Sequence, residues 1–349
     1  MAEYYIGAND EHGINPPTIG KRTPIMPYLN RAIYENEFNY PTKNFFIQAC
    51  LRQNFDTYDV KPERNDISIT TRVRRVNSQN LTLLVTFAYN AFGSGNTFNS
   101  ASGVITFYSD QNRFVTRSRA LSEDIYDRLT NGNFRAGMGI GILDVGMLSS
   151  VNCPATLIEA GFMTNFEEAK LMLNPDYQID IAEKTCQGVC DYLDVNYINR
   201  TDLNNYPLLR QGNRGNYVKL LQSLLNTAGI DLSIDGIFGQ DTLTAVRGFQ
   251  NGNGLVADGI VGNQTWKTLL WLPPYPVLRR GSRGNYVLYL QQLLLSKLYD
   301  VGEIDGIFGS RTQAAVTQFQ RENGLVVDGV VGSRTWNTIK ISSGRKLNW

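Results

Sequence analysis

The sequence has little of several features that would place it in a familiar functional class. It contains one histidine and four cysteines, and its 33 Lys+Arg nearly balance its 32 Asp+Glu. A net charge of +1 gives no bulk attraction to nucleic acid or to an anionic membrane surface. It has no run of about 18 apolar residues, which excludes a membrane-spanning helix of the usual length. We therefore expect no nucleic-acid or membrane partner, so that any binding depends on specific sites.

The N-terminal residues also lack the features of an export signal. The first ten, Met-Ala-Glu-Tyr-Tyr-Ile-Gly-Ala-Asn-Asp, have neither a basic segment nor the apolar segment of a secretory signal peptide. We therefore expect synthesis in the cytoplasm without a signal peptide.

The cysteines indicate no disulfide framework. They all lie in the first 200 residues and form no Cys-x-x-Cys pair: Cys50, Cys153, Cys186 and Cys190. Cys186 and Cys190 are one helical turn apart and could be neighbours, but buried free thiols are the expected state.

The second half of the chain is a tandem repeat. Tyr206-Pro-Leu-Leu-Arg-Gln-Gly-Asn-Arg-Gly-Asn-Tyr-Val returns in similar form from Tyr275, and Ile234-Asp-Gly-Ile-Phe-Gly returns unchanged from Ile304. Each copy has an apolar stripe at helical spacing and Asp-Gly turns between helical segments, which predicts a small three-helix bundle. Four large aromatic residues are expected to fill the two cores: Phe249, Phe319, Trp266 and Trp336.

These copies resemble the peptidoglycan-binding domain 1 family over nearly all of residues 206 to 340. The match includes Arg-x-Gly-x-x-Gly-x-x-Val, Asp-Gly-x-Phe-Gly-x-x-Thr and a closing Thr-Trp. The resemblance implies two wall-binding modules, at 206–271 and 272–341, after a linker at 199–205 and before a tail at 342–349. Two weak modules on one chain gain avidity on a polymeric wall. The residues that contact peptidoglycan are not predicted.

One stretch of the first half, Cys153-Pro-Ala-Thr-Leu-Ile-Glu-Ala-Gly-Phe-Met-Thr-Asn, has the features of a strand that leads to a site. An apolar, β-branched run follows Pro154 and ends at Gly161 in a turn-rich segment, so Glu159 is expected at the C-terminal end of the strand. Open α/β sheets bind ligands at that edge. The alternative is that Glu159 only caps the helix expected near Asn165.

This stretch resembles the glutamate motif of the zinc-dependent N-acetylmuramoyl-L-alanine amidases of the amidase 3 type. The resemblance implies an α/β domain over residues 1–198, with a twisted, mainly parallel sheet flanked by helices. In the family Glu159 would be the catalytic general base, which takes a proton from the attacking water and returns it to the departing amine.

The same resemblance implies two metal ligands near the N-terminus. The family begins with a strand and a Gly-His-Gly-like turn whose histidine binds zinc, which corresponds to His12, although Glu11 replaces the first glycine. A glutamate early in the following helix is the second ligand. Asn-Glu-aromatic-x-Tyr-x-x-Lys is similar to the version in clostridial phage endolysins, so Glu37 is preferred and Glu35 is the competing candidate.

The third family ligand is missing. The family pattern after a central strand is Ser-Ile-His-x-Asn-Ala, and alignment on Asn90-Ala91 places Ala88 where the histidine stands. Catalytic zinc uses three protein ligands and a water, often His₂Glu, so Zn²⁺ should be weakly held or absent and this chain inactive or crippled. Two explanations remain: a natural pseudoenzyme that binds the wall, or a variant with a single His→Ala change. We favour the second because every other motif is intact.

The resemblance implies a bacterial cell-wall hydrolase, an autolysin or endolysin that cleaves the amide between N-acetylmuramic acid and L-alanine in peptidoglycan. A non-catalytic wall binder and a metallopeptidase that cuts the stem peptide are the alternatives. Without a signal peptide, access to the wall would require a phage holin, mother-cell lysis during spore formation, or a phage-tail-like particle.

Overall fold

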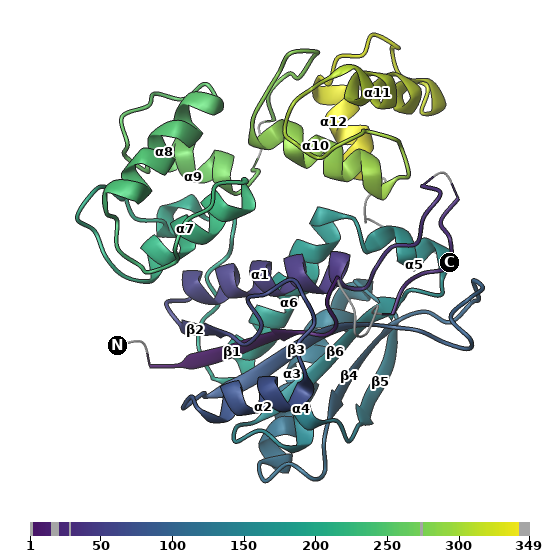
Figure 1. Cartoon of the computed structure of the whole chain (residues 1–349), viewed down its shortest axis with the longest axis vertical. Helices are drawn as coiled ribbons and strands as arrows, with labels where there is room; N and C mark the ends of the chain where they lie inside the picture. Colours follow the sequence, from purple (N-terminus) through teal and green to yellow (C-terminus); the bar gives the residue numbers. More distant parts are fainter. Residues whose placement is uncertain (1–2, 15–20, 28, 273–274, 342–349) are drawn as a thin grey trace. The chain divides into compact units, whose positions relative to one another are not determined.

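The computed structural model describes residues 3–14, 21–27, 29–272 and 275–341 (Figure 1). These residues divide into two compact units, one made of Met1–Met172 and Gln178–Tyr197, the other of Leu173–Tyr177 and Ile198–Trp349. The predicted tail at 342–349 lies outside the described residues.

The first unit is built on one six-stranded sheet. In spatial order its strands are β2 (Asp56–Asp59), β1 (Tyr5–Asp10), β3 (Leu83–Asn90), β6 (Ala155–Phe162), β4 (Val104–Tyr108) and β5 (Gly137–Ile142). Every neighbouring pair is parallel except β4 and β6, which run antiparallel. β3 and β6 lie at the centre because they are apolar almost throughout and can be buried on both faces. The predicted mainly parallel sheet is confirmed.

Helices cover both faces of this sheet. They are α1 (Asn36–Arg52), α2 (Ile69–Asn77), α3 (Val115–Thr130), α4 (Gly146–Ser149), α5 (Phe166–Leu171) and α6 (Pro175–Tyr192). On one face α1 packs its Phe46 ring 5.4 Å from that of Phe87 on β3. On the opposite face α2 and α4 enclose an apolar cluster that includes Leu84, Ala88 and Leu157. Since side chains alternate along a strand, residues 84 and 88 share the face that Phe87 does not.

The second unit contains two similar three-helix modules. The first has α7 (Asn216–Thr227), α8 (Gln240–Gly252) and α9 (Asn263–Leu269), and the second has α10 (Asn285–Ser296), α11 (Ser310–Glu322) and α12 (Ser333–Ile341). The closing tryptophans are buried, and their indole N–H groups donate to the carbonyls of Pro207 and Pro276, at 2.9 Å from Trp266 and 2.8 Å from Trp336. The predicted three-helix bundles and their aromatic cores are confirmed.

Each module is also held by two buried glutamines in matching polar networks. The Gln250 side-chain amide donates to Asp258 and Thr265, and its carbonyl oxygen accepts from the backbone N–H of Gly259. Gln222 repeats this pattern earlier in the same module, and Gln291 and Gln320 repeat it in the second. Each module therefore repeats one helix–turn–helix arrangement twice, with the middle helix shared by both copies. The sequence analysis did not detect this internal repeat.

Among the described residues, no helix is long and apolar enough to cross a membrane. The four cysteines, all in the first unit, are free and buried, as expected.

Candidate functional site

The turn after β1 presents the single histidine. His12 has a left-handed backbone with φ of 57°, and its carbonyl accepts a hydrogen bond of 3.0 Å from the Asn36 side chain at the start of α1. The next residue must be glycine, because a Cβ on Gly13 would lie 2.1 Å from the backbone nitrogen of Asp66. The backbone N–H of Glu11 donates to the carbonyl of Phe87 at 3.0 Å, which extends the pairing of β1 with β3. The turn is therefore fixed against β3 and α1.

Glu35, the residue before α1, faces this histidine. Its Oε2 lies 3.6 Å from His12 Nε2 and accepts no hydrogen bond. Its Oε1 accepts bonds of 2.9 Å from both the Asn39 side chain and the Tyr89 backbone N–H. Burial raises the pKa of Glu35 to about 7, with His12 lowering it and the Glu159 carboxylate raising it.

Glu37, the glutamate preferred from the sequence, is occupied elsewhere. Its two oxygens accept bonds of 2.8 Å from the two terminal nitrogens of Arg31, and Oε2 also accepts from the Tyr34 backbone N–H. A carboxylate paired bidentately in this way has little capacity left for another ligand. The structure therefore brings Glu35, and not Glu37, against His12, and a ligand role for Glu37 remains a prediction from the sequence.

Glu159 stands inside β6 and not at its end, since the strand continues to Phe162. Its side chain is partly buried, and Oε2 has no hydrogen-bond partner. Burial raises the pKa of Glu159 to about 7, while Lys21 lowers it and Glu11 raises it. Gly161, expected in a turn, also belongs to the strand. Glycine is required there because a Cβ would lie 2.5 Å from the hydroxyl of Tyr89.

Ala88 lies directly beside this glutamate. It is 3% exposed and is the register partner of Glu159 in the parallel pairing of β3 with β6. Parallel register partners direct their side chains to the same face of a sheet, so a side chain at position 88 leaves the sheet beside that of Glu159. The alanine methyl packs in the apolar cluster under α2 and α4 and offers no ligand atom.

These residues do not complete a catalytic zinc site. The unpartnered Oε2 of Glu35 and the neighbouring imidazole of His12 could supply two ligands. Catalytic zinc requires three protein ligands, and no group of three or more His, Cys, Asp or Glu side chains in the described part of the chain could hold a metal ion. The residues present therefore fall one ligand short.

A buried ionic network beneath the histidine turn was missed from the sequence. The Asp10 carboxylate lies 2.8 Å from both Lys43 Nζ and Lys61 Nζ, and all three side chains are fully buried. Asn36 donates to the same carboxylate at 3.2 Å and so links it to the His12 turn. Its signal was the Asn-Asp-Glu-His run, whose first two polar residues, Asn9 and Asp10, are buried at the end of β1.

Comparisons with known proteins identify two families in the chain. Residues 18–191 match the family model for N-acetylmuramoyl-L-alanine amidase, and residues 214–269 and 283–339 match that for a putative peptidoglycan binding domain. A probable N-acetylmuramoyl-L-alanine amidase of Bacillus licheniformis is 35% identical over 152 residues, 37% of this chain and 43% of the relative. The N-acetylmuramoyl-L-alanine amidase CwlM of Mycobacterium tuberculosis is 33% identical over 130 residues, 34% of this chain and 31% of the relative.

The chain thus spans less than half the length of these curated relatives. Among solved structures, the crystal structure of an N-acetylmuramoyl-L-alanine amidase from Clostridium difficile 630 has 26% sequence identity and a TM-score of 0.46. The match covers 56% of this chain and 98% of that one.

Proposed function

Because residues 18–191 belong to the N-acetylmuramoyl-L-alanine amidase family and two putative peptidoglycan binding domains follow them, we propose that this chain has the architecture of a cell-wall amidase. Its substrate is the amide between N-acetylmuramic acid and L-alanine of peptidoglycan. The observation that carries the proposal is the placement of Glu35 Oε2 at 3.6 Å from His12 Nε2, together with the unpartnered carboxylate oxygen of Glu159 on the central strand β6.

Glu159 is the general base of this proposal. Its raised pKa of about 7 lets it accept a proton from water near neutral pH and release that proton to a departing amine. Its unpartnered oxygen leaves it free to do so. The alternative that Glu159 caps a helix finds no support, because the side chain of Asn165 accepts the bonds from the first turn of α5.

The metal centre of the proposal consists of His12, Glu35 and a third ligand at position 88. The zinc that the family resemblance implies would there act as a Lewis acid toward the amide carbonyl. Since Ala88 supplies no ligand, we propose that the chain as written binds zinc weakly and is inactive or crippled. Because every other family motif in the sequence is intact, a single His→Ala change is favoured over a natural pseudoenzyme.

A non-catalytic wall binder and a metallopeptidase acting on the stem peptide are the rival functions. The delivery of the chain to the wall, by a holin, in sporulation or in a phage-tail-like particle, remains a prediction from the sequence.

Product analysis separates these functions. Purified peptidoglycan would be incubated with the chain as written and with Ala88→His, each with zinc supplied, and the soluble products identified by mass spectrometry. If Ala88→His, but not the chain as written, releases intact stem peptides with new L-alanine amino groups, the result supports an amidase whose site Ala88 inactivates. Shortened stems would identify a peptidase. If neither form yields product while both sediment with the wall, the catalytic proposal fails and the binder remains.

A further inference from the structure

Two glycines on α8 have no conformational or packing reason to be glycine. Gly248 and Gly252 lie one turn apart on its exposed side, and neither has the positive φ that favours this residue. A Cβ added at either position meets no atom within 4 Å. Glycine weakens a helix relative to alanine, so the pair lowers the stability of α8. It also leaves open space beside this face of the helix.

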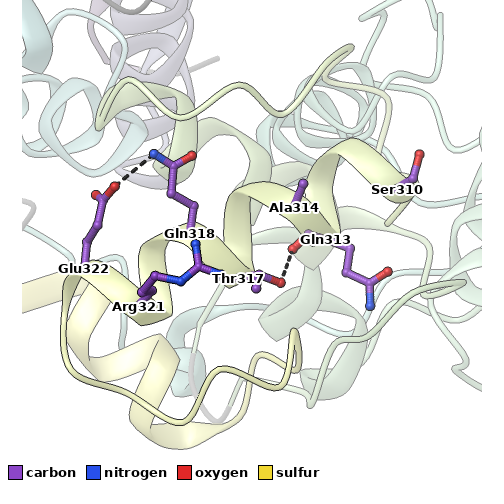
Figure 2. Close-up of a pocket in the computed structure, with 7 residues that line it drawn as sticks. All are labelled: Ser310, Gln313, Ala314, Thr317, Gln318, Arg321 and Glu322. Atoms are coloured by element: carbon purple, nitrogen blue, oxygen red, sulfur yellow. Dashed lines mark hydrogen bonds between the residues drawn. The ribbon is translucent and has the colours of Figure 1, made fainter.

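The second module has larger side chains at the two equivalent positions. The residues that correspond to Gly248 and Gly252 are Gln318 and Glu322 on α11, whose side chains share a hydrogen bond of 2.9 Å (Figure 2). The Tyr299 hydroxyl adds a bond of 2.6 Å to the other oxygen of Glu322. Because the modules share one fold, the fold itself does not demand glycine at these positions.

The open space in the first module is part of a groove with a volume of about 370 Å³. This volume lies in the range of roughly 300–1,000 Å³ that is usual for small-molecule sites. One wall carries Ile230, Phe249 and the two glycines, and the start of α10 with the turn at Asp305 forms the other. The Asn253 side chain accepts a bond of 2.8 Å from the Asn285 backbone N–H, so the two walls are joined by a specific contact.

Asn285 gives this groove an unsatisfied hydrogen-bond acceptor. The residue is 4% exposed, and its side-chain N–H group donates to the Thr268 carbonyl at 2.9 Å. Its side-chain oxygen is buried and accepts no hydrogen bond. Buried polar atoms are nearly always paired, and a turn of the Asn285 side chain toward the groove it lines would offer this oxygen to a donor from a bound molecule.

The lining also defines the kind of ligand. Asp305 is the one charged residue among those that line the groove, and its carboxylate already accepts from Gln291 and from the Ile307 backbone N–H. No cationic side chain lines the groove to neutralise the carboxylates of a stem peptide. An N-acetyl group fits better, because its methyl can rest on Phe249 and Ile230 while its amide N–H donates to Asn285.

We propose that this groove binds the glycan strand of peptidoglycan through its N-acetylated amino sugars. The inference rests on the proposed wall-binding function and deepens it by naming the glycan, and not the stem peptide, as the ligand. It also assigns the two modules unequal roles, since the second module has Gln318 and Glu322 in place of the two glycines, and there they line a separate hollow of about 600 Å³ together with the charged Arg321.

The test measures binding of chitotetraose, a soluble N-acetylglucosamine tetramer, to the full chain by titration calorimetry. The variant Gly248→Gln/Gly252→Glu places the side chains of the second module in the groove and should weaken binding at least about tenfold. Its matched control, Gln318→Gly/Glu322→Gly, makes the reverse exchange on α11 and should bind like the unchanged chain. A melting temperature of the groove variant equal to or above that of the unchanged chain shows that the modules remain folded.

Three results would overturn the inference: equal affinity of the groove variant, an equal loss in the α11 control, or binding of a soluble stem tetrapeptide in place of chitotetraose. Sedimentation with purified wall and the product analysis of Ala88→His are run in parallel. If the chain sediments with wall and Ala88→His releases the amidase product, while the groove variant binds chitotetraose as the unchanged chain does, the glycan inference fails and the proposed function stands. If Ala88→His releases no product while chitotetraose binding depends on the groove, the catalytic proposal fails and the glycan inference stands.

Discussion

Ala88 on β3 and Glu159 on β6 are direct partners in the parallel ladder, and their side chains leave the sheet on the same face. An imidazole at position 88 would therefore stand beside the proposed general base. Glu35 Oε2 lies 3.6 Å from His12 Nε2, and the Glu159 carboxylate contributes to the raised pKa of Glu35. The missing ligand thus has a defined place in the structure as well as in the sequence pattern.

Restoring that ligand should create a metal site. We expect Ala88→His to bind about one equivalent of zinc and the chain as written to bind it at least about a hundredfold more weakly, because a catalytic site needs three protein ligands. The measurement is a competition titration against a chromogenic chelator, with bound metal quantified after gel filtration.

The double variant Ala88→His/His12→Ala serves as the control for this site. It again has two ligands and should lose the gained affinity. If it binds zinc as tightly as Ala88→His, the new histidine binds metal somewhere other than the site described.

The choice between the two glutamates can be tested in the Ala88→His background. Glu35→Gln should reduce zinc affinity and peptidoglycan hydrolysis at least about a hundredfold, since it replaces the carboxylate that faces His12. Glu37→Gln should have a much smaller effect, because it removes only the contacts to Arg31 and Tyr34.

Both glutamate variants would be assayed for bound zinc and for released L-alanine amino groups at equal folded concentration. The reverse order, with Glu37→Gln the more damaging, would return the ligand role to the residue preferred from the sequence.

Much of the fold could be predicted because its signals are local and repeated. Apolar runs predicted the central strands β3 and β6, and the repeated Asp-Gly turns with closing Trp residues predicted two helical modules. The polar networks of Gln222 and Gln250 could not be predicted, because their glutamine-to-threonine spacings differ and a glutamine on a helix normally indicates an exposed position.

The site was only partly predictable for a related reason. Glu35 and Glu37 are two residues apart, and sequence spacing does not reveal which carboxylate turns toward His12. That choice depends on Arg31, which pairs with Glu37, and on the Tyr89 backbone N–H, which binds Glu35 from another strand. The Tyr89 contact joins residues 54 apart and leaves no local pattern.

Glu159 should make the metal-free chain less stable as the pH rises. Its pKa is about 7 in the folded chain and near 4.5 when exposed, so the folded state binds more protons between these values. Stability then falls as the pH rises from 4.5 to 7, which is the reverse of the behaviour of a salt-bridged acid. Glu159→Gln should raise the free energy of unfolding by roughly 1–3 kcal/mol at pH 8 and by little at pH 5.

The measurement for this variant is urea unfolding at both pH values with a chelator present. Glu123→Gln on α3, which removes an exposed carboxylate paired with Arg119, is the control and should change stability little at either pH. Equal effects of Glu159→Gln at pH 5 and pH 8 would mean that Glu159 is not protonated preferentially in the folded state.

The buried glutamine networks should account for a large part of the stability of each module. Gln250→Ala leaves the Gly259 N–H without its acceptor and removes the donor to Asp258 and Thr265, so the module should lose about 1–3 kcal/mol. The exposed Gln264→Ala on α9 is the matched control and should change stability by less than about 0.5 kcal/mol.

Amide hydrogen exchange followed by mass spectrometry reads each module separately in the full chain. Faster exchange in α8 and α9 for Gln250→Ala, with the first unit unchanged, is the expected result, whereas protection equal to that of the control would show that the glutamine is dispensable.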